Sequence, residues 1–250
     1  MNRNSLRILL LQARNDPPTQ QEELAEFSRY SGLRPDQFTV LNGFDQAEFP
    51  PTVIHSHHAL FIGGSSDASV LKPDLYPFVP PSQALILYCL EQRIPVFASC
   101  FGFQLAVEAL GGRVILDREH MEMGTYPIYL TPNAEADPLC QTLPAEFLAI
   151  SGHQERAVSL PPEAIHLAYS QLCPYHGFTL PEQPFYAFQF HPEVNRADLI
   201  ARISRYCERY FEHPDSLQDL ANSAQETPIA NQLIATFVDR ILLKSPQLTR

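Results

Sequence analysis

Short apolar runs alternate with amphipathic segments through the first half of the chain. Each run is only a few residues long, which is typical of strands buried on both faces of a parallel sheet. We predict such strands at 7–11, 38–41, 59–62, 95–98 and 114–116. The segments between them carry apolar residues at helical spacing, and we predict helices at 20–30, 83–92 and 101–110.

Residues 121–190 carry mainly strand-like runs, and the pattern changes again after them. We predict strands at 126–130, 147–150, 165–168 and 185–190, then helices at 197–211 and 229–243. The polar stretch 213–227 is predicted to be a surface linker. The whole pattern predicts an α/β protein of three layers, a mainly parallel sheet flanked by helices. We expect one domain over 1–212, and a linker and C-terminal helix over 213–250 that pack on the same domain.

The composition narrows the possible functions. Of the 250 residues, 45% are hydrophobic, which is enough for a sizeable core, and the net charge is −11. A chain this acidic, without a basic run, argues against binding to nucleic acid or to an anionic membrane. Its apolar runs are far shorter than the ~20 residues that a membrane-spanning helix needs.

The cysteines and histidines predict neither disulfides nor a bound metal. Five cysteines form an odd number with no Cys-x-x-Cys pair, which favours a reducing, cytoplasmic location. His55, His57 and His58 lack helical spacing and nearby carboxylates, so we expect them in a solvated loop. We expect no metal ligands and no organic cofactor. We expect a structural role for four of the cysteines, Cys89, Cys140, Cys173 and Cys207.

Cys100 is different, because it stands between a predicted strand and a predicted helix, in Ala98-Ser99-Cys100-Phe101-Gly102. A sharp strand-to-helix turn can hold a nucleophile at its tip if small residues flank it. The dipole of the following helix favours the thiolate, which is the reactive form of the side chain. A cysteine also precedes many ordinary helices, so the turn alone leaves both interpretations open.

A second motif, Phe188-Gln189-Phe190-His191-Pro192-Glu193, lies at the end of a predicted strand. Residues two apart in an extended chain point the same way, so Glu193 can bond to the imidazole of His191. A carboxylate on one ring nitrogen fixes the tautomer and leaves the other nitrogen to take the thiol proton. The alternative is a packed strand end without chemistry.

Gly63 and Gly64 follow the predicted strand 59–62. Paired glycines let backbone N–H groups approach a ligand closely. Such donors, together with the N–H of Phe101, could stabilise the oxyanion of a tetrahedral intermediate. The same pair also suits an ordinary turn.

In their order along the chain, these motifs resemble the class I (triad) glutamine amidotransferase family, as in the glutaminase part of GMP synthetase. The matching stretches, which cover roughly residues 5–210, begin at Ala59 (ALFIGGS), Pro95 (PVFASCFGFQLA), Gly111 (GGRV), His153 (HQE) and Phe188 (FQFHPE). The resemblance implies a flavodoxin-like fold, here with a C-terminal helical extension.

The resemblance also implies roles for individual residues. Cys100 would be the nucleophile, His191 the general base and acid, and Glu193 the residue that orients it. Gly64 and Phe101 would form the oxyanion hole. The residues implied in substrate binding are Gly63, Gln104, Gly152, His153 and Gln154. Two stretches depart from the family pattern, which usually has glycine at Ala98 and Ser-His-Gly-Asp at 152–155.

Three functions remain open. The first is hydrolysis of the glutamine side-chain amide through a Cys thioester, with ammonia passed to a separate acceptor or synthetase subunit, because no such domain is fused within these residues. The second is a γ-glutamyl peptidase or hydrolase with the same triad, in which loops 66–82 and 118–127 make room for another leaving group. The third is a binding module with a silent site, against which the complete set of Cys100, His191 and Glu193 argues.

Overall fold

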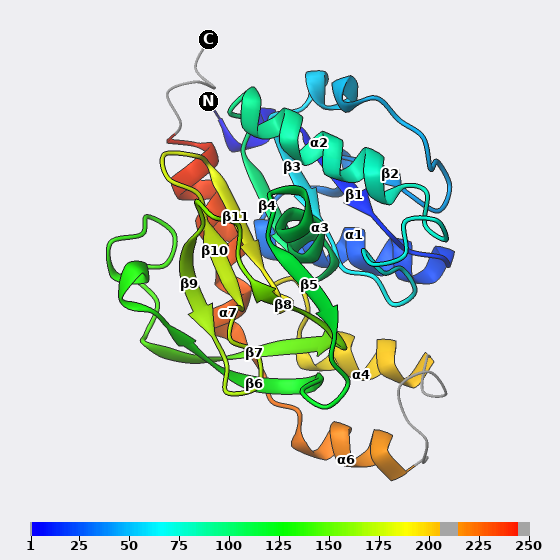
Figure 1. Ribbon diagram of the computed structural model, residues 1–250, viewed down its shortest axis with the longest axis vertical. Coiled ribbons are helices and arrows are strands. Elements are labelled where there is room, and N and C mark those ends of the chain that lie inside the picture. Colours follow the sequence, from blue (N-terminus) through cyan, green and yellow to red (C-terminus); the bar gives the residue numbers. More distant parts are fainter. Residues whose placement is uncertain (1, 206–214, 245–250) are drawn as a thin grey trace.

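A nine-stranded sheet forms the centre of the computed structural model, which describes residues 2–205 and 215–244 (Figure 1). Its strand order is β2-β1-β3-β4-β11-β10-β9-β6-β7. The parallel part consists of β1 (Ile8–Gln12), β2 (Phe38–Asn42), β3 (Ala59–Ile62), β4 (Val96–Ser99) and β11 (Phe185–Phe188). The antiparallel part consists of β10 (Gly177–Thr179), β9 (Ile165–Tyr169), β6 (Glu122–Leu130) and β7 (Glu146–His153). A separate antiparallel pair joins β5 (Arg113–Leu116) to β8 (Glu155–Ser159).

Helices cover both faces of the parallel part, so the predicted three-layer α/β fold is confirmed (Figure 1). On one face lie α2 (Val79–Glu91) and α3 (Phe101–Ala109), and on the other α1 (Pro17–Ser31) and α7 (Pro228–Phe237). A π-helical turn, Val238–Leu242, continues α7. The helices α4 (Arg196–Arg205) and α6 (Asp215–Ser223) pack on each other beside β6. Short 3-10 helices occupy Arg3–Ser5, Pro35–Gln37, Pro51–Ser56 and Pro132–Glu135.

The first crossover shows why these residues form these elements. The Asp16 side chain accepts a hydrogen bond from the backbone N–H of Thr19 at 2.9 Å, and Pro17 opens the helix α1. The helix ends at Gly32, whose φ of 66° suits a residue without a side chain. This crossover returns the chain to β2, parallel to β1.

Two hydrophobic clusters lie on opposite faces of the sheet. Because alternate residues of a strand point to opposite faces, β1 contributes Leu9 and Leu11 to one cluster and Ile8 and Leu10 to the other. The second cluster also contains Phe237 of α7. The C-terminal helix is therefore part of the core.

The structure differs from the prediction in two places. The stretch 213–227, predicted to be a linker, contains α6, because Leu217, Leu220 and Ala224 at helical spacing pack against Ile150 and α4. The strands β8 and β10 were not predicted. Residues 206–211 of the predicted helix 197–211 lie outside the described part, and so does Cys207.

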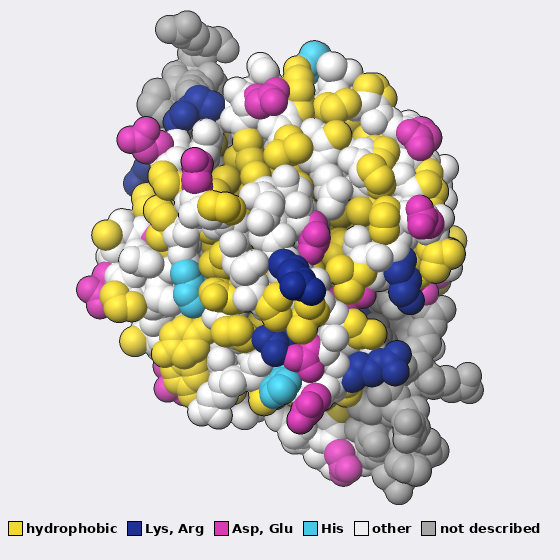
Figure 2. All heavy atoms as spheres, in the orientation of Figure 1, with side chains coloured by type: hydrophobic (Ala, Val, Ile, Leu, Met, Phe, Trp, Pro, Cys, Tyr) yellow, Lys and Arg dark blue, Asp and Glu magenta, His cyan; other side chains and the backbone are white. Residues whose placement is uncertain are grey.

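Within the described residues, none of the helices is both long and apolar enough to cross a bilayer. On the face drawn in Figure 2, basic side chains lie beside acidic ones instead of forming one continuous field.

Candidate active site

Cys100 lies at the tip of the turn between β4 and α3, where the sequence predicts a nucleophile. Its backbone has φ 50° and ψ −102°, a conformation that residues with a side chain rarely adopt. Its N–H donates to the Phe188 carbonyl at 2.8 Å, which fixes the turn to β11. Gly102 is required for space, since a Cβ there would lie 2.8 Å from the Cβ of Ile62. The predicted sharp turn with small flanking residues is therefore present.

His191 and Glu193 follow the end of β11, the parallel neighbour of β4. The ring Nδ1 of His191 bonds to Oε1 of Glu193 at 2.7 Å. The hydroxyl of Ser99, next to the cysteine, donates to the same carboxylate oxygen at 3.1 Å. His191 also donates its backbone N–H to the Ile150 carbonyl at 2.8 Å. The imidazole is thus held at Nδ1 by a carboxylate that is itself hydrogen-bonded, on a backbone that is fixed to β7.

Cys100 also interacts electrostatically with the side chain of His191. Burial lowers the pKa of His191, but Cys100 and Glu193 outweigh burial and raise this pKa to about 10. Burial raises the pKa of Glu193, yet the adjacent His191 keeps it below its ordinary value. The structure therefore brings the three residues predicted as a triad into one interacting group, with a charged imidazole beside a charged carboxylate.

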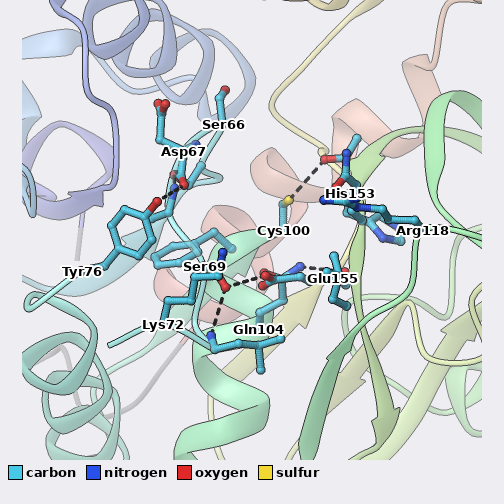
Figure 3. Close-up of a pocket in the computed structure, with 17 residues that line it drawn as sticks. Ser66, Asp67, Ser69, Lys72, Tyr76, Cys100, Gln104, Arg118, His153 and Glu155 are labelled. Atoms are coloured by element: carbon cyan, nitrogen blue, oxygen red, sulfur yellow. Dashed lines mark hydrogen bonds between the residues drawn. The ribbon is translucent and has the colours of Figure 1, made fainter. Parts of the chain in front are cut away.

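A cavity of about 310 Å³ opens over Cys100 (Figure 3). The Cys100 sulfur points into it and lies 4.0 Å from the Gly152 carbonyl oxygen. Its walls come from the segment after β3, from α3 and from the β7–β8 connection. The polar and charged side chains in these walls include Ser69, Lys72, Gln104, Arg118, His153 and Glu155.

The residues predicted to bind substrate are mostly at this cavity. Gln104, Gly152, His153 and Gln154 line it, and the Gln104 amide donates to the Glu155 carbonyl at 2.9 Å. Gly63 does not line it, and its N–H already donates to the Leu11 carbonyl at 3.2 Å.

The two predicted oxyanion residues contact different parts of the site. Phe101, the residue after the cysteine, begins α3 and lines the cavity. Gly64 packs directly on the imidazole, since a Cβ there would lie 2.6 Å from Cε1 of His191. The role of their N–H groups stays a prediction.

Sequence reasoning missed several polar side chains that support the site. The hydroxyl of Ser69 donates to the carboxyl of Glu155 in the cavity wall, while burial raises the pKa of that carboxyl. The side-chain amide of Asn231 in α7 donates to the carbonyls of Pro192 and Val194, at 2.8 and 2.9 Å. These partners are far apart in the chain, so the sequence pattern contained no signal for them.

His153 belongs to a second buried group. Its Nε2 lies 3.0 Å from Oε2 of Glu122, and Nε2 of His176 lies 2.7 Å from the same oxygen. Burial lowers the pKa of His153. Burial raises the pKa of Glu122, but the two histidines outweigh burial and hold this pKa well below its ordinary value.

The fold and this geometry together define a class of α/β protein with a cysteine at a strand-to-helix turn and a His–Glu pair beside it. A family described as glutamine amidotransferase class-I matches residues 51–201, a range that contains Cys100, His191 and Glu193. The chain belongs to the class I glutamine amidotransferase family.

Curated relatives support this membership. Over 122 residues the chain is 31% identical to one subunit of the glutamine-hydrolysing GMP synthase from Methanococcus aeolicus, covering 47% of this chain and 63% of the relative. Over 160 residues it is 30% identical to the glutamine-hydrolysing GMP synthase of a Nitratiruptor species, covering 64% of this chain and 30% of the relative. The matched part spans less than two thirds of either relative.

Solved structures share the fold across almost the whole chain. A glutamine amidotransferase from Thermotoga maritima has a TM-score of 0.76 at 20% identity, covering 96% of this chain and 99% of that one. A glutamine amidotransferase from Methylobacillus flagellatus has a TM-score of 0.71 at 24% identity, covering 95% and 96%. At these identities the likeness shows the fold alone.

Proposed function

We propose that the protein hydrolyses the side-chain amide of glutamine through a Cys100 thioester, with release of glutamate and ammonia. The observation that carries this proposal is the position of His191, which bonds to Glu193 through Nδ1 and interacts electrostatically with Cys100. The sulfur of Cys100 points into a cavity that is open to a small substrate. This is the arrangement of nucleophile, proton carrier and orienting carboxylate that acyl transfer requires.

The first half-reaction forms the thioester. The Cys100 thiolate attacks the amide carbon of the glutamine side chain, and a C–S bond forms as the carbonyl becomes an oxyanion. The N–H groups of Gly64 and Phe101 are the proposed oxyanion donors. The imidazolium of His191 then gives its proton to the nitrogen, the C–N bond breaks, and ammonia leaves.

The second half-reaction releases glutamate. The imidazole of His191, now neutral, takes a proton from water, and the resulting hydroxide attacks the thioester carbon. The C–S bond breaks and the sulfur leaves as thiolate beside the imidazolium, which restores the starting charges. The segment 152–154 and Gln104 are proposed to hold the amino-acid end of glutamine, because they line the cavity around the sulfur.

The ammonia is proposed to pass to a separate acceptor subunit. The relative from Methanococcus aeolicus is named as one subunit of a GMP synthase, a name that describes one part of an assembly. Delivery to a neighbouring active site also prevents loss of ammonia to solvent. Since the proposed chemistry needs a free thiol and the four described cysteines are free, we propose a reducing, cytoplasmic location.

A γ-glutamyl hydrolase with the same triad is the second candidate. The cavity of about 310 Å³ falls at the lower end of the range for sites that hold drug-sized ligands. Lys72 and Arg118 in its wall are suited to the carboxylate of a leaving amino acid or peptide. The acyl half is the same in both reactions, so the two candidates differ only in the leaving group.

Mass spectrometry with a γ-glutamyl electrophile tests the shared chemistry. We expect one adduct, on Cys100, and loss of glutamine hydrolysis by at least roughly 1,000-fold in Cys100→Ser. The matched control is Cys140→Ser, because Cys140 is also buried and free but lies in the other face of the core. An adduct on another cysteine, or full turnover in Cys100→Ser, contradicts the proposal.

Rates with glutamine and with γ-glutamyl dipeptides, measured side by side, separate the two candidates. A higher kcat/KM for glutamine supports the amidotransferase. A higher kcat/KM for the dipeptides supports the γ-glutamyl hydrolase.

A further inference from the structure

The buried group behind the Cys100 cavity contains more than the His153–Glu122 contact. Glu122 opens β6 and His153 ends β7, where the two residues are partners in the antiparallel pairing. His176 immediately precedes β10, and Cys173 lies three residues before it in the β9–β10 connection. All four side chains are buried.

The Glu122 carboxylate fixes the tautomer of both histidines. Its Oε2 contacts Nε2 of His153 at 3.0 Å and Nε2 of His176 at 2.7 Å, and its other oxygen accepts a hydrogen bond from the Ser170 hydroxyl. Because an ionised carboxylate only accepts hydrogen bonds, each Nε2 carries a hydrogen. In the neutral form of each imidazole, the lone pair is therefore on Nδ1.

Neither Nδ1 atom has a hydrogen-bond partner among the described residues, although both are buried. A buried nitrogen with a free lone pair is unfavourable unless something binds it. One ring nitrogen of each histidine and the sulfur of Cys173 lie within 4.8 Å of one another. Two imidazoles and one thiol thus meet at one point in the interior.

We propose that His153, Cys173 and His176 bind a zinc ion. Imidazole nitrogen and thiolate sulfur are the ligands that zinc prefers, and the carboxylate of Glu122 on the opposite ring nitrogens is the usual support for histidine ligands. Cys173 and His176 have the two-residue spacer common between zinc ligands. This proposal departs from our sequence-based expectation that the chain has no metal ligands.

Metal binding replaces the hydrogen of the Cys173 thiol with a metal–sulfur bond, and one proton leaves to solvent. The ion has a route to the group, since His153 also lines the Cys100 cavity. A bound ion would hold the His153 ring in place, and with it the segment 152–154 beside the Cys100 sulfur. Zinc would then stabilise one wall of the cavity.

The test uses the full chain with Cys100→Ser as background, because the Cys100–His191 pair is itself a competing ligand set for zinc. The protein is treated with a chelator, dialysed, and titrated with zinc chloride in a calorimeter. We expect one zinc ion per chain. Loss of a residue that only hydrogen-bonds to a metal ligand typically weakens metal binding by roughly 10- to 100-fold. We expect Cys173→Ser and His176→Gln each to weaken zinc binding by more than this, because each removes a ligand.

The matched control is Cys140→Ser in the same background, a buried free cysteine outside the group, which we expect to bind zinc unchanged. Cobalt(II) gives a second measurement, by absorption instead of by heat. With Cys100 removed, cobalt must still produce the near-ultraviolet absorption of a thiolate–cobalt bond, and Cys173→Ser must abolish it.

Two results overturn the proposal. One is the absence of zinc binding and of the thiolate–cobalt absorption in the Cys100→Ser protein. The other is zinc affinity in folded Cys173→Ser and His176→Gln equal to that of Cys140→Ser. None of these measurements needs turnover, so their outcome is separate from that of the proposed function.

Discussion

Burial and neighbouring charges shift the pKa of His191 in opposite directions. Removal from water disfavours a charged imidazole, yet Cys100 and Glu193 raise its pKa to about 10. Near neutral pH the ring of His191 therefore carries a proton on both nitrogens. On the alkaline side, the imidazolium is lost and nothing remains to protonate the leaving nitrogen.

Glu193→Gln tests this account through the pH dependence of the rate. The amide removes one of the two groups that hold the proton on His191, so we expect this pKa to fall toward its ordinary value. Activity of the variant should remain measurable. In the native protein, activity should decline at about pH 10 on the alkaline side, and in Glu193→Gln this decline should come at a lower pH. The measurement is kcat/KM over roughly pH 5 to 10 for both proteins. An alkaline limb that does not move contradicts the assignment.

Gly64→Ala tests the packing of the imidazole. A Cβ at this position lies 2.6 Å from Cε1 of His191, so the ring must shift away from Cys100 or Glu193. We expect a loss of activity on the order of 100-fold, because a displacement of about 1 Å is enough for such an effect. Activity and thermal unfolding are measured on the same sample. Native activity in a folded Gly64→Ala protein shows that the ring position is not critical.

Among the elements, α7 is hydrogen-bonded to the segment that carries His191 and Glu193, although it is far from them in the sequence. Asn231 donates to the carbonyls on both sides of Glu193, those of Pro192 and Val194. These carbonyls belong to the segment that carries the His–Glu pair. A helix at the far end of the sequence therefore positions the proposed base.

Asn231→Ala removes both hydrogen bonds and leaves two carbonyls without these donors. We expect the free energy of unfolding to fall by roughly 1–3 kcal/mol and kcat to fall more than KM rises. The control is Gln232→Ala, the exposed neighbour on the same helix, which should change neither. Urea unfolding and steady-state kinetics check both effects. Equal behaviour of the two variants rules out a positioning role for Asn231.

The sequence was most informative where apolar runs are continuous. It predicted β1, β3, β4 and α3, and hence the turn at Cys100, because strands buried on both faces leave an unmistakable run of apolar residues. It missed β8, whose five residues are mostly exposed or half-buried, and β10, whose three residues are too few for a pattern.

The sequence located the candidate site through local motifs. It gave no sign of the contacts between residues that are far apart in the chain. Cys100 and the His191–Glu193 pair stand in short recognisable stretches. Glu122 and His176 become partners only because β6, β7 and β10 come together in the antiparallel part of the sheet. No local pattern encodes that pairing, so the second buried group could be found only in the structure.

At the scale of the whole molecule, the sheet separates two cores, and α7 completes one of them. The ring of Phe237 lies 5.2 Å from that of Phe97 and 5.8 Å from that of Phe61, on the central strands β4 and β3. Both strands also lead into the loops of the site. Removal of this one side chain should therefore affect the molecule as a whole.

Phe237→Ala is expected to lower the free energy of unfolding by about 3–5 kcal/mol, since a buried aromatic ring leaves a cavity that packing cannot fill. Ile229→Ala, in the same helix but 36% exposed, is the control and should change stability much less. Urea unfolding followed by fluorescence and by circular dichroism gives both values. A small effect of Phe237→Ala shows that α7 is peripheral.

The backbone angles of Cys100 have a consequence for how this protein responds to engineering. A residue held with φ 50° and ψ −102° stores strain on the order of 1–3 kcal/mol, which glycine at the same position would relieve. Cys100→Gly is thus expected to melt at a higher temperature than the native chain and to have no reactive sulfur. Selection for heat resistance alone would therefore favour loss of the sulfur that the proposed reaction needs.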